Sequence, residues 1–400
     1  MIDYQTFYYL YFVLFSVALL YAGQKITSKK NVIFVINILF HVLYFYFNKK
    51  QFASFQLILL TGYFAAKWLS EKEERKNLSA FLVSFTALVF IELKYSALQF
   101  TVLRGIAPTI AFIGLSFVTF RLISLFVDLK RKAIKREITF IDYYNYITFF
   151  PSYLSGPLDK YGHFVSETEK ENEPDIKELL ENIYRIVLGT FKKIVIADFL
   201  ANLSIDSMYT PDVLLLPFYK VMISMYIYSM VLYFDFSGYS DVAVGVGGLF
   251  GIKVPENFNS PFSSKNIQEF WNRWHISFMH WLRDYVYYPL QMFLLKTVKI
   301  KNTVLVASLG FFVTFLIAGL WHGSSKHYFY YGLYHGICYS IYLIWRHFLL
   351  KKGTLAFKTF YNKSNGIKIL SVVITYHYFI LGLFFFTDKY HYFLNLLGIK

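Results

Sequence analysis

The 400-residue chain has one cysteine and few charged side chains. Cys338 lies inside an apolar run, so the sequence offers no disulfide framework, no CxxC metal pattern and no indication of a thiol nucleophile. Charged residues make up 16% of the chain, whereas a soluble globular protein normally carries about a quarter. These two shortages argue against a disulfide-rich scaffold and against a soluble protein.

Several common catalytic patterns are absent as well. The sequence has no GxSxG turn. His275 and His322 stand in no HxxxH or HExxH arrangement, and neither His327 nor His335 follows His322 at three or four positions, so no metal site is predicted. No repeat of fixed period supports a repeat-built transporter. No small-residue cleavage site follows the first apolar run, so we expect no cleavable signal peptide.

Hydrophobic residues dominate what is present. They make up 56% of the chain, aromatic residues make up 22%, and many apolar runs reach the roughly 17 residues that cross a bilayer. We therefore predict an all-α polytopic membrane protein with roughly nine to eleven membrane elements. The main runs cover 4–23, 31–46, 52–69, 78–93, 106–129, 214–236, 303–321 with a continuation to 345, and 369–386.

The net charge of +15 comes from Lys and Arg clusters between these runs. Such clusters are typical of cytoplasmic loops and of contact with anionic lipid head groups. We predict no nucleic-acid partner. Arg121 lies inside the fifth run, where snorkelling toward the cytoplasmic interface is favoured over a catalytic role.

Two stretches do not fit a simple membrane span. Pro151, Gly156 and Pro157 interrupt the aromatic segment 138–164, which predicts a re-entrant segment with non-helical backbone. An acidic loop at 167–181 leads into a helix over 176–200, whose mixture of basic and apolar residues predicts a position in the membrane interface.

The helix predicted over 214–236 is followed by acidic and glycine-rich residues. Asp235 and Asp241 bracket its expected last turn, where a capping or loop role is about as plausible as a catalytic one. The following VAVGVGGLFG resembles a nucleotide-binding loop only superficially, because no hydrophilic βαβ pattern surrounds it. Close helix packing through small residues is the better explanation.

The most distinctive polar stretch covers 255–290. Ser264 or Asn266 caps a predicted helix that runs to about Tyr288 and is stopped by Pro289. On this helix His275 shares an aromatic face with Trp271, Phe278, Met279 and Leu282, which suits the interface plane. A structural, aromatic-packed His275 and a functional one are equally compatible with the pattern.

The second histidine of interest is His322, in AGLWHGSSKHYFYYGLYH. Apolar runs flank it, and titratable groups at membrane depth usually line a cavity or reaction path, although helix packing is the alternative. We expect Gly319 and Gly323 to leave room for a ligand beside the ring. An imidazole titrates near neutral pH and suits proton transfer from a hydroxyl.

Three motifs together carry a resemblance to a known family: PENFNSPF, FWNRWHISFMHWLRDYVYYPL and GLWHG. The chain resembles the membrane-bound O-acyltransferase family from about residue 114 onward, and the family's two signature histidines fall on His275 and His322. The resemblance implies a ring of helices around a thinned centre, where tunnels from both sides meet. It also implies one membrane-embedded domain over 1–400, with N-terminal helices at 1–138 and a catalytic core at 139–400.

Further motifs resemble the members that D-alanylate teichoic acids, namely SGPLDKYGHF, IGLSFVTFR and the tail VVITYHYF. This resemblance implies a multi-pass protein of the bacterial cell membrane with no permanently bound cofactor. The implied acyl donor is a phosphopantetheine thioester on a small acidic D-alanyl carrier protein, and basic loops such as 130–136 would dock it. The implied acceptor is an anionic cell-envelope polymer, and other membrane proteins of the pathway are expected partners.

The resemblance assigns His322 as general base, or as the group that holds the donor, and His275 as its catalytic partner. Asn272, His275 or Trp N–H groups are candidate donors to the oxyanion. The predicted substrate-binding residues are Trp271, Asn272, Arg273, Trp274, Trp321 and Asp284.

Other readings stay open. SGYSD, PENFN and LRDYVYYPL lean toward relatives that O-acetylate alginate and other exported polysaccharides. A proton-coupled transporter that uses the histidines as a relay, and a structural membrane scaffold, are the alternatives from other classes.

Overall fold

The computed structural model describes residues 7–46, 48–71, 76–94, 112, 114–170, 174–208, 210–352 and 364–396. Within these ranges the chain is helical, and its one β feature is an isolated antiparallel bridge between Phe258 and Trp274. The predicted all-α fold is confirmed. The chain packs as two compact units, one of Met1–Ile194 with Phe236–Glu256 and one of Val195–Asp235 with Asn257–Lys400. The predicted division at residue 138 stays a prediction.

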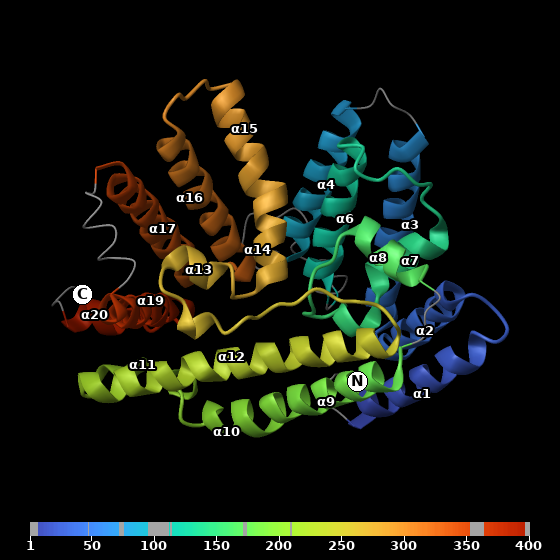
Figure 1. The fold of residues 1–400 in the computed structure, drawn as a ribbon, viewed down its shortest axis with the longest axis horizontal. Coiled ribbons are helices and arrows are strands. Elements are labelled where there is room, and N and C mark those ends of the chain that lie inside the picture. Colours follow the sequence, from blue (N-terminus) through green and yellow to red (C-terminus); the bar gives the residue numbers. More distant parts are fainter. Residues whose placement is uncertain are drawn as a thin grey trace. The chain divides into compact units, whose positions relative to one another are not determined.

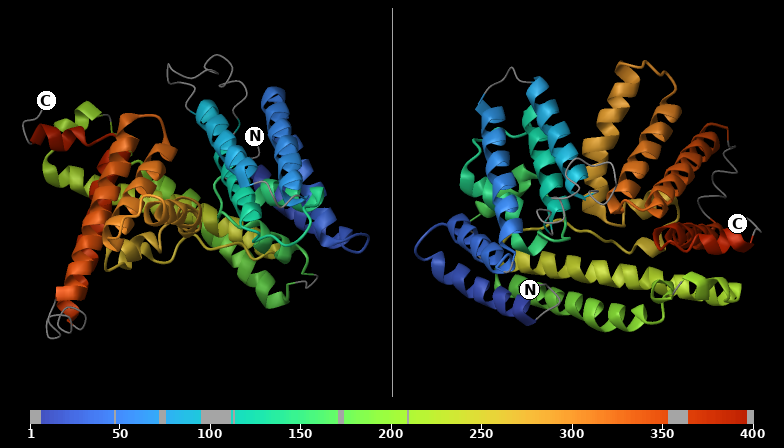
Figure 2. Two further views of the ribbon diagram at one scale, coloured as in Figure 1. Left: turned by 90° about the horizontal axis from the view of Figure 1, so that it is seen from above. Right: turned by 180° about the vertical axis from the view of Figure 1, so that it is seen from behind.

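The first unit is built largely from the N-terminal helices. Helices α3, α4 and α6 pack against one another and stand side by side in both views (Figures 1 and 2). Its elements are α1 (Phe7–Gly23), α2 (Lys29–Tyr44), α3 (Lys49–Glu71), α4 (Lys76–Lys94), α6 (Leu115–Lys130), α7 (Phe140–Thr148), the 3₁₀ turn η1 (Phe150–Ser152), α8 (Tyr161–Thr168), α9 (Ile176–Phe191) and the second half of α12 (Phe218–Leu249).

The second unit contains the first half of α12 and the C-terminal helices. Helices α16 and α17 form its most extensive helix pair, and α19 packs on α17. Its elements are α10 (Asp198–Ala201), η3 (Ile205–Ser207), α11 (Thr210–Leu214), η4 (Pro261–Ser263), α13 (Ile267–Trp271), α14 (Ile276–Leu282), the π-helical turn η5 (Arg283–Tyr287), α15 (Tyr288–Lys296), α16 (Thr303–His322), α17 (Lys326–Lys352), α19 (Asn365–Phe386) and α20 (His391–Leu396).

Membrane character is visible in the helix lengths. Four of the described helices, α3, α12, α16 and α19, are long and apolar enough to cross a bilayer, and 8–23 and 78–91 form shorter apolar helices. The chain is a polytopic membrane protein. The total of nine to eleven elements stays a prediction, and part of the expected fifth run, 106–111, lies outside the described residues.

The broken aromatic segment is confirmed as non-continuous helix. It consists of α7, η1, an extended stretch and α8, and most of its side chains are buried. Arg121 of α6 closes this break: its guanidinium donates to the carbonyl of Ile147 at 2.7 Å and to the carbonyl of Ser152 at 2.9 Å. With 2% of its surface exposed, Arg121 does not snorkel, so that prediction was wrong. The buried cation instead satisfies backbone oxygens that the interrupted helix leaves open.

Helix α12 continues well past its predicted end. It runs through Asp235 and Asp241 to Leu249, so the two acids do not bracket a last turn. The Asp241 carboxylate lies 2.6 Å from the Lys192 ammonium and 3.1 Å from the Arg185 guanidinium, which neutralise it within the helix packing.

The glycine-rich sequence serves helix packing, as predicted. A Cβ on Gly238 would lie 2.6 Å from the carbonyl oxygen of Gly189 in α9, and a Cβ on Gly245 would lie 2.8 Å from the carbonyl oxygen of Asn182. The helices approach so closely because no side chain separates them.

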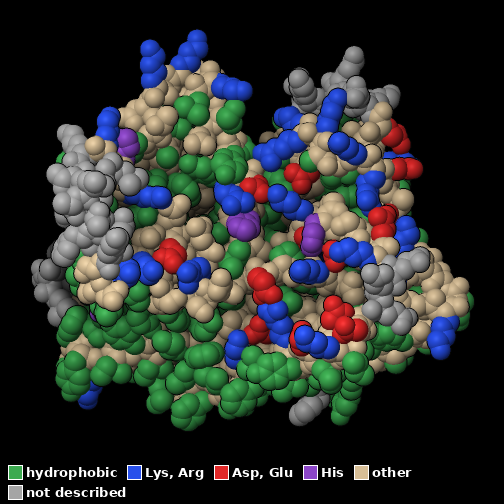
Figure 3. Space-filling view, viewed as in Figure 1, with side chains coloured by type: hydrophobic (Ala, Val, Ile, Leu, Met, Phe, Trp, Pro, Cys, Tyr) green, Lys and Arg blue, Asp and Glu red, His purple; other side chains and the backbone are tan. Residues whose placement is uncertain are grey.

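Helix α9 confirms the helical prediction for 176–191, and a π-helical turn (Lys192–Ala197) and α10 continue it. Its N-terminus carries a capping box formed by Asp175 and Glu178. Glu167 belongs to α8 and is buried, so it is not part of a solvated loop as expected. Hydrophobic side chains gather over α9 in Figure 3, and the exposed ones are Ile176, Leu180, Ile183, Tyr184, Val187 and Phe191. An exposed apolar face of this kind suits a helix in the membrane interface.

Candidate active site

His275 lies in a sharp break between α13 and α14. Asn266 caps α13 through Glu269, as predicted, but α13 ends at Trp271. His275 then adopts a left-handed backbone conformation with φ 45°, which is rare for a residue with a side chain. The prediction of one helix to about Tyr288 was therefore wrong. Pro289 does not stop a helix either, because it occupies the first turn of α15.

A separate strand-like segment holds this break in place. The backbone of Asn257 accepts a hydrogen bond from the Ile276 amide at 2.9 Å, and the Asn259 amide donates to the carbonyl of Arg273 at 3.0 Å. The Asn257 side chain accepts hydrogen bonds from the Ser277 amide and hydroxyl. Residues of the motifs PENFN and WNRWH thus form one local structure, which fixes the backbone at His275.

His322 is the last residue of α16, and Gly323 follows it in extended conformation. The glycines around it pack helices rather than make room for a ligand. A Cβ on Gly319 would lie 2.7 Å from the Cα of Gly332 in α17, and a Cβ on Gly323 would lie 2.5 Å from the Tyr328 ring. The expectation of open space beside these glycines was wrong, because α17 fills it.

An aromatic cluster joins the two histidines within the second unit. The Trp321 ring centroid lies 4.6 Å from that of His322 and 6.4 Å from that of His275. The Phe278 ring packs against Trp321, at a centroid distance of 4.6 Å, and stacks on His275 at 4.9 Å. Three of the predicted site residues, His275, Trp321 and His322, therefore lie together.

The surroundings give the two imidazoles different properties. His275 is 6% exposed, and burial together with the nearby His322 lowers the pKa of His275 to about 3. His275 is consequently neutral near pH 7 rather than a cation. His322 is only partly buried, with the rings of Tyr331 and Phe386 edge-on to it at 5.6 Å and 5.0 Å.

The remaining predicted site residues have identifiable structural contacts. Trp274 is buried against Phe258, Phe270 and Phe379. The assignment of Trp274 and of the four residues in the next sentence to substrate binding stays a prediction. Arg273 pairs with Glu269 at 2.6 Å, Asn272 is exposed at the end of α13, Asp284 lies 3.1 Å from the Arg283 guanidinium, and Trp271 donates to the Tyr378 hydroxyl.

The comparison with known proteins supplies the family. The model of the membrane-bound O-acyltransferase family, MBOAT, matches residues 4–385. The chain belongs to this family. It is 35% identical to the teichoic acid D-alanyltransferase of Bacillus subtilis over 288 residues, covering 70% of this chain and 69% of the relative. It is 31% identical to that of Lacticaseibacillus rhamnosus over 306 residues, covering 74% of each chain. It is also 35% identical to the probable alginate O-acetylase of Pseudomonas aeruginosa over 234 residues, covering 57% of this chain and 42% of the relative.

The chain is thus a membrane O-acyltransferase, and its structure adds residues that sequence reasoning missed. His335 of α17 is fully buried, and its Nδ1 atom lies 2.5 Å from the Tyr378 hydroxyl. In the sequence His335 stands out only as a histidine, and it does not follow His322 at the three or four positions typical of a metal-ligand pair. Within the described ranges no group of three or more His, Cys, Asp or Glu side chains has a metal-binding arrangement.

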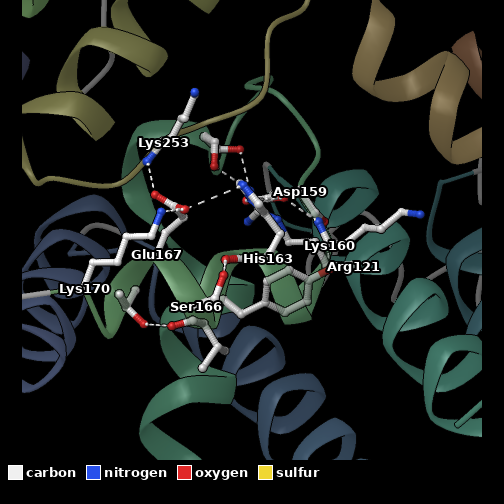
Figure 4. Close-up of polar contacts among 12 residues, drawn as sticks. Arg121, Asp159, Lys160, His163, Ser166, Glu167, Lys170 and Lys253 are labelled. Carbon is white, nitrogen blue, oxygen red and sulfur yellow. Dashed lines mark hydrogen bonds and ion pairs between the residues drawn. The ribbon is translucent and has the colours of Figure 1, made fainter. Parts of the chain in front are cut away.

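A cluster of polar side chains around His163 of α8 lies in the first unit (Figure 4). His163 Nδ1 lies 2.8 Å from one Asp159 carboxylate oxygen, and its other ring nitrogen lies 3.9 Å from Glu167. The hydrogen bond to Asp159 raises the pKa of His163 above its ordinary value, against a smaller effect of burial. Glu167 also accepts a hydrogen bond from the Lys253 amide. The cluster ties α8 to the segment after α12, so its evident role is structural.

Proposed function

We propose that this O-acyltransferase moves D-alanine from the phosphopantetheine thioester of a small acidic carrier protein toward a teichoic acid hydroxyl. The names of its relatives support the acyl group and the acceptor. The observation that carries the proposal is the cluster of His275, Trp321 and His322. In it the buried, neutral imidazole of His275 lies near the only partly buried imidazole of His322.

The chemistry follows from these two environments. His322 takes the proton of the acceptor hydroxyl while the oxygen attacks the thioester carbonyl carbon. The new C–O bond forms, the C–S bond breaks, and the departing thiolate receives a proton, so that an ester and a thiol result. His275, neutral at the working pH, is suited to donate a hydrogen bond to the oxyanion of the tetrahedral intermediate.

The basic loop after α6 is the proposed contact for the carrier. Lys130, Arg131, Lys132, Lys135 and Arg136 are exposed in the first unit, and Arg136 pairs with Glu169 at 2.7 Å. A positive surface of this kind steers an acidic partner to the membrane and accelerates association at low ionic strength.

Transfer measured in reconstituted vesicles tests the proposal. Carrier protein bearing radiolabelled D-alanine is supplied on one side and teichoic acid on the other, with His322→Gln as the matched variant. The expected result is labelled polymer that accumulates only with wild-type protein. Absence of label with wild-type protein, at a carrier concentration that supports binding, contradicts the D-alanyl assignment.

O-acetylation of an exported polysaccharide is the second candidate. It is favoured by the 35% identity to a probable alginate O-acetylase and the 34% identity to the peptidoglycan O-acetyltransferase of Helicobacter pylori over 256 residues. The same vesicles with a radiolabelled acetyl thioester and a polysaccharide acceptor separate the two. Acetyl transfer without D-alanyl transfer replaces the first proposal with the second.

A further inference from the structure

His335 occupies an aromatic box next to the candidate active site. None of its surface is exposed. The ring centroids of Trp271, Tyr331 and Tyr378 lie 5.0, 4.4 and 5.0 Å from that of His335, each ring roughly perpendicular to the imidazole. A polar side chain in such a place requires a hydrogen-bonding explanation.

One hydroxyl group connects His335 to the WNRWH motif. The Trp271 indole N–H donates to the Tyr378 hydroxyl oxygen at 2.9 Å, and the same oxygen lies 2.5 Å from His335 Nδ1. An indole nitrogen can only donate, so the Tyr378 oxygen accepts from Trp271; of the two groups that contact this hydroxyl only His335 Nδ1 can accept its proton, which is therefore directed there. Nδ1 is then the acceptor, and the proton of a neutral His335 resides on Nε2.

The opposite edge of the ring is held by backbone. A Cβ on Gly382 would lie 2.5 Å from His335 Nε2. No described residue hydrogen-bonds Nε2, which is buried. A packing role alone would favour an apolar ring of the same size, because a buried N–H without a partner destabilises the fold. The histidine therefore has a reason other than packing.

Tyr331 links this ring to His322. Its ring lies edge-on to His335 at 4.4 Å and edge-on to His322 at 5.6 Å. Tyr331 and His335 occupy consecutive turns on the same face of α17, which is the spacing at which helical side chains contact. The orientation of Tyr331, and with it one wall of the His322 site, therefore depends on the orientation of His335.

We propose that Trp271, Tyr378 and His335 form a hydrogen-bonded chain that fixes Tyr331 and thereby positions His322. The inference rests on the proposed function of His322 as the proton acceptor. His335 is a positioning residue, neutral and protonated on Nε2, and it does not touch substrate. Trp271, predicted to bind substrate, is the anchor of this chain.

Steady-state transfer with full-length protein in vesicles tests the chain, with each rate normalised to folded protein. We expect His335→Phe and Tyr378→Phe each to lower kcat about tenfold with KM nearly unchanged, because small misplacements of a reacting group cost rate rather than affinity. The double variant should be no slower than either single variant. His335→Asn, which keeps an acceptor for the Tyr378 hydroxyl, should restore most of kcat.

Tyr334→Phe is the matched control, because it removes a hydroxyl that donates to the Tyr378 carbonyl at 2.9 Å in the same aromatic cluster. Its kcat should equal that of the wild type. A wild-type kcat in His335→Phe, or multiplying effects in the double variant, would overturn the inference. Wild-type protein without any transfer activity would instead contradict the proposed function.

A readout that needs no turnover is the tautomer of His335. In wild-type protein with ¹⁵N-labelled histidine, the His335 ring should give the signals of a neutral imidazole protonated on Nε2. The signal is assigned by its loss in His335→Asn. A ring protonated on Nδ1, or on both nitrogens near pH 7, contradicts the hydrogen-bonded chain.

Discussion

The Asn257 side-chain oxygen accepts a hydrogen bond from the Ser277 hydroxyl at 2.6 Å. This contact joins two motifs 20 positions apart and holds the break that presents His275. Asn257 is 1% exposed, so the loss of its amide leaves buried donors on Ser277.

Asn257→Ala should therefore destabilise the protein by about 1–3 kcal/mol. It should also reduce transfer, since the turn at His275 loosens. Chemical denaturation and initial rates measure the two effects. Asn259→Ala is the control: the Asn259 side chain is exposed, and only its backbone amide contributes to the pairing. Equal behaviour of the two variants would show that the side-chain contact is unimportant.

The contribution of the His275 backbone conformation to stability can be measured separately from that of its imidazole ring. A non-glycine residue in the left-handed region costs about 1–2 kcal/mol. His275→Gly should hence be more stable than His275→Ala by about 1 kcal/mol, although both lack the imidazole and should lose activity. Thermal unfolding of the two variants measures the difference. An alanine variant as stable as the glycine variant would mean that the left-handed turn is absent.

The packing of α9 on α12 predicts that a side chain at Gly238 destabilises the protein. Gly238→Ala places a methyl group 2.6 Å from the backbone carbonyl of Gly189, which cannot move aside, so the helices must separate. A loss of about 1–3 kcal/mol is expected.

Gly162→Ala is the matched control, because nothing lies within 4 Å of the added Cβ in α8. A gain of up to about 1 kcal/mol is expected there, since alanine favours a helix. Thermal melts in one detergent compare the two. A tolerated Gly238→Ala would contradict the close approach of the helices.

His163 should make stability depend on pH. Its pKa is raised mainly by the hydrogen bond to Asp159, so its contribution is fully present below the unfolded value of 6.5 and disappears as the pH rises through the higher folded value. His163→Gln should accordingly destabilise the protein at about pH 5.5 and have little effect at about pH 9. The effect should stay under about 1 kcal/mol, because the side chain is 44% exposed.

Asp159→Asn supplies the partner variant for this measurement. In its presence the pH-dependent effect of His163→Gln should shrink to the smaller part that comes from Glu167, 3.9 Å from the other ring nitrogen. A pH-dependent difference that persists undiminished without the Asp159 carboxylate would assign the effect to another group.

The sequence was informative wherever the deciding interactions are local. Apolar runs located the helices, Pro151 and Pro157 located the interruption, and Asn266 located a helix cap. The small residues after Asp241 were correctly explained by helix packing. The apolar runs, the prolines and the cap depend on neighbours within a few positions along the chain, and the small residues are recognisable from composition alone.

The errors arose where distant residues decide the structure. Arg121 points inward because carbonyl groups 26 and 31 positions away accept its hydrogen bonds. Asp241 lies inside α12 rather than at its end, and Arg185, 56 positions earlier, pairs with it there. His335 acquires its role from Tyr378, 43 positions later. Periodicity and spacing do not contain such pairings.

The central claim is that His322 accepts the proton of the acceptor hydroxyl, and the rate of acyl transfer by His322→Gln tests it most directly. With equal amounts of folded protein in vesicles, we predict that this variant is at least about 100-fold slower than wild type, the typical contribution of a general base. A His322→Gln protein that transfers the acyl group at the wild-type rate would contradict the mechanism.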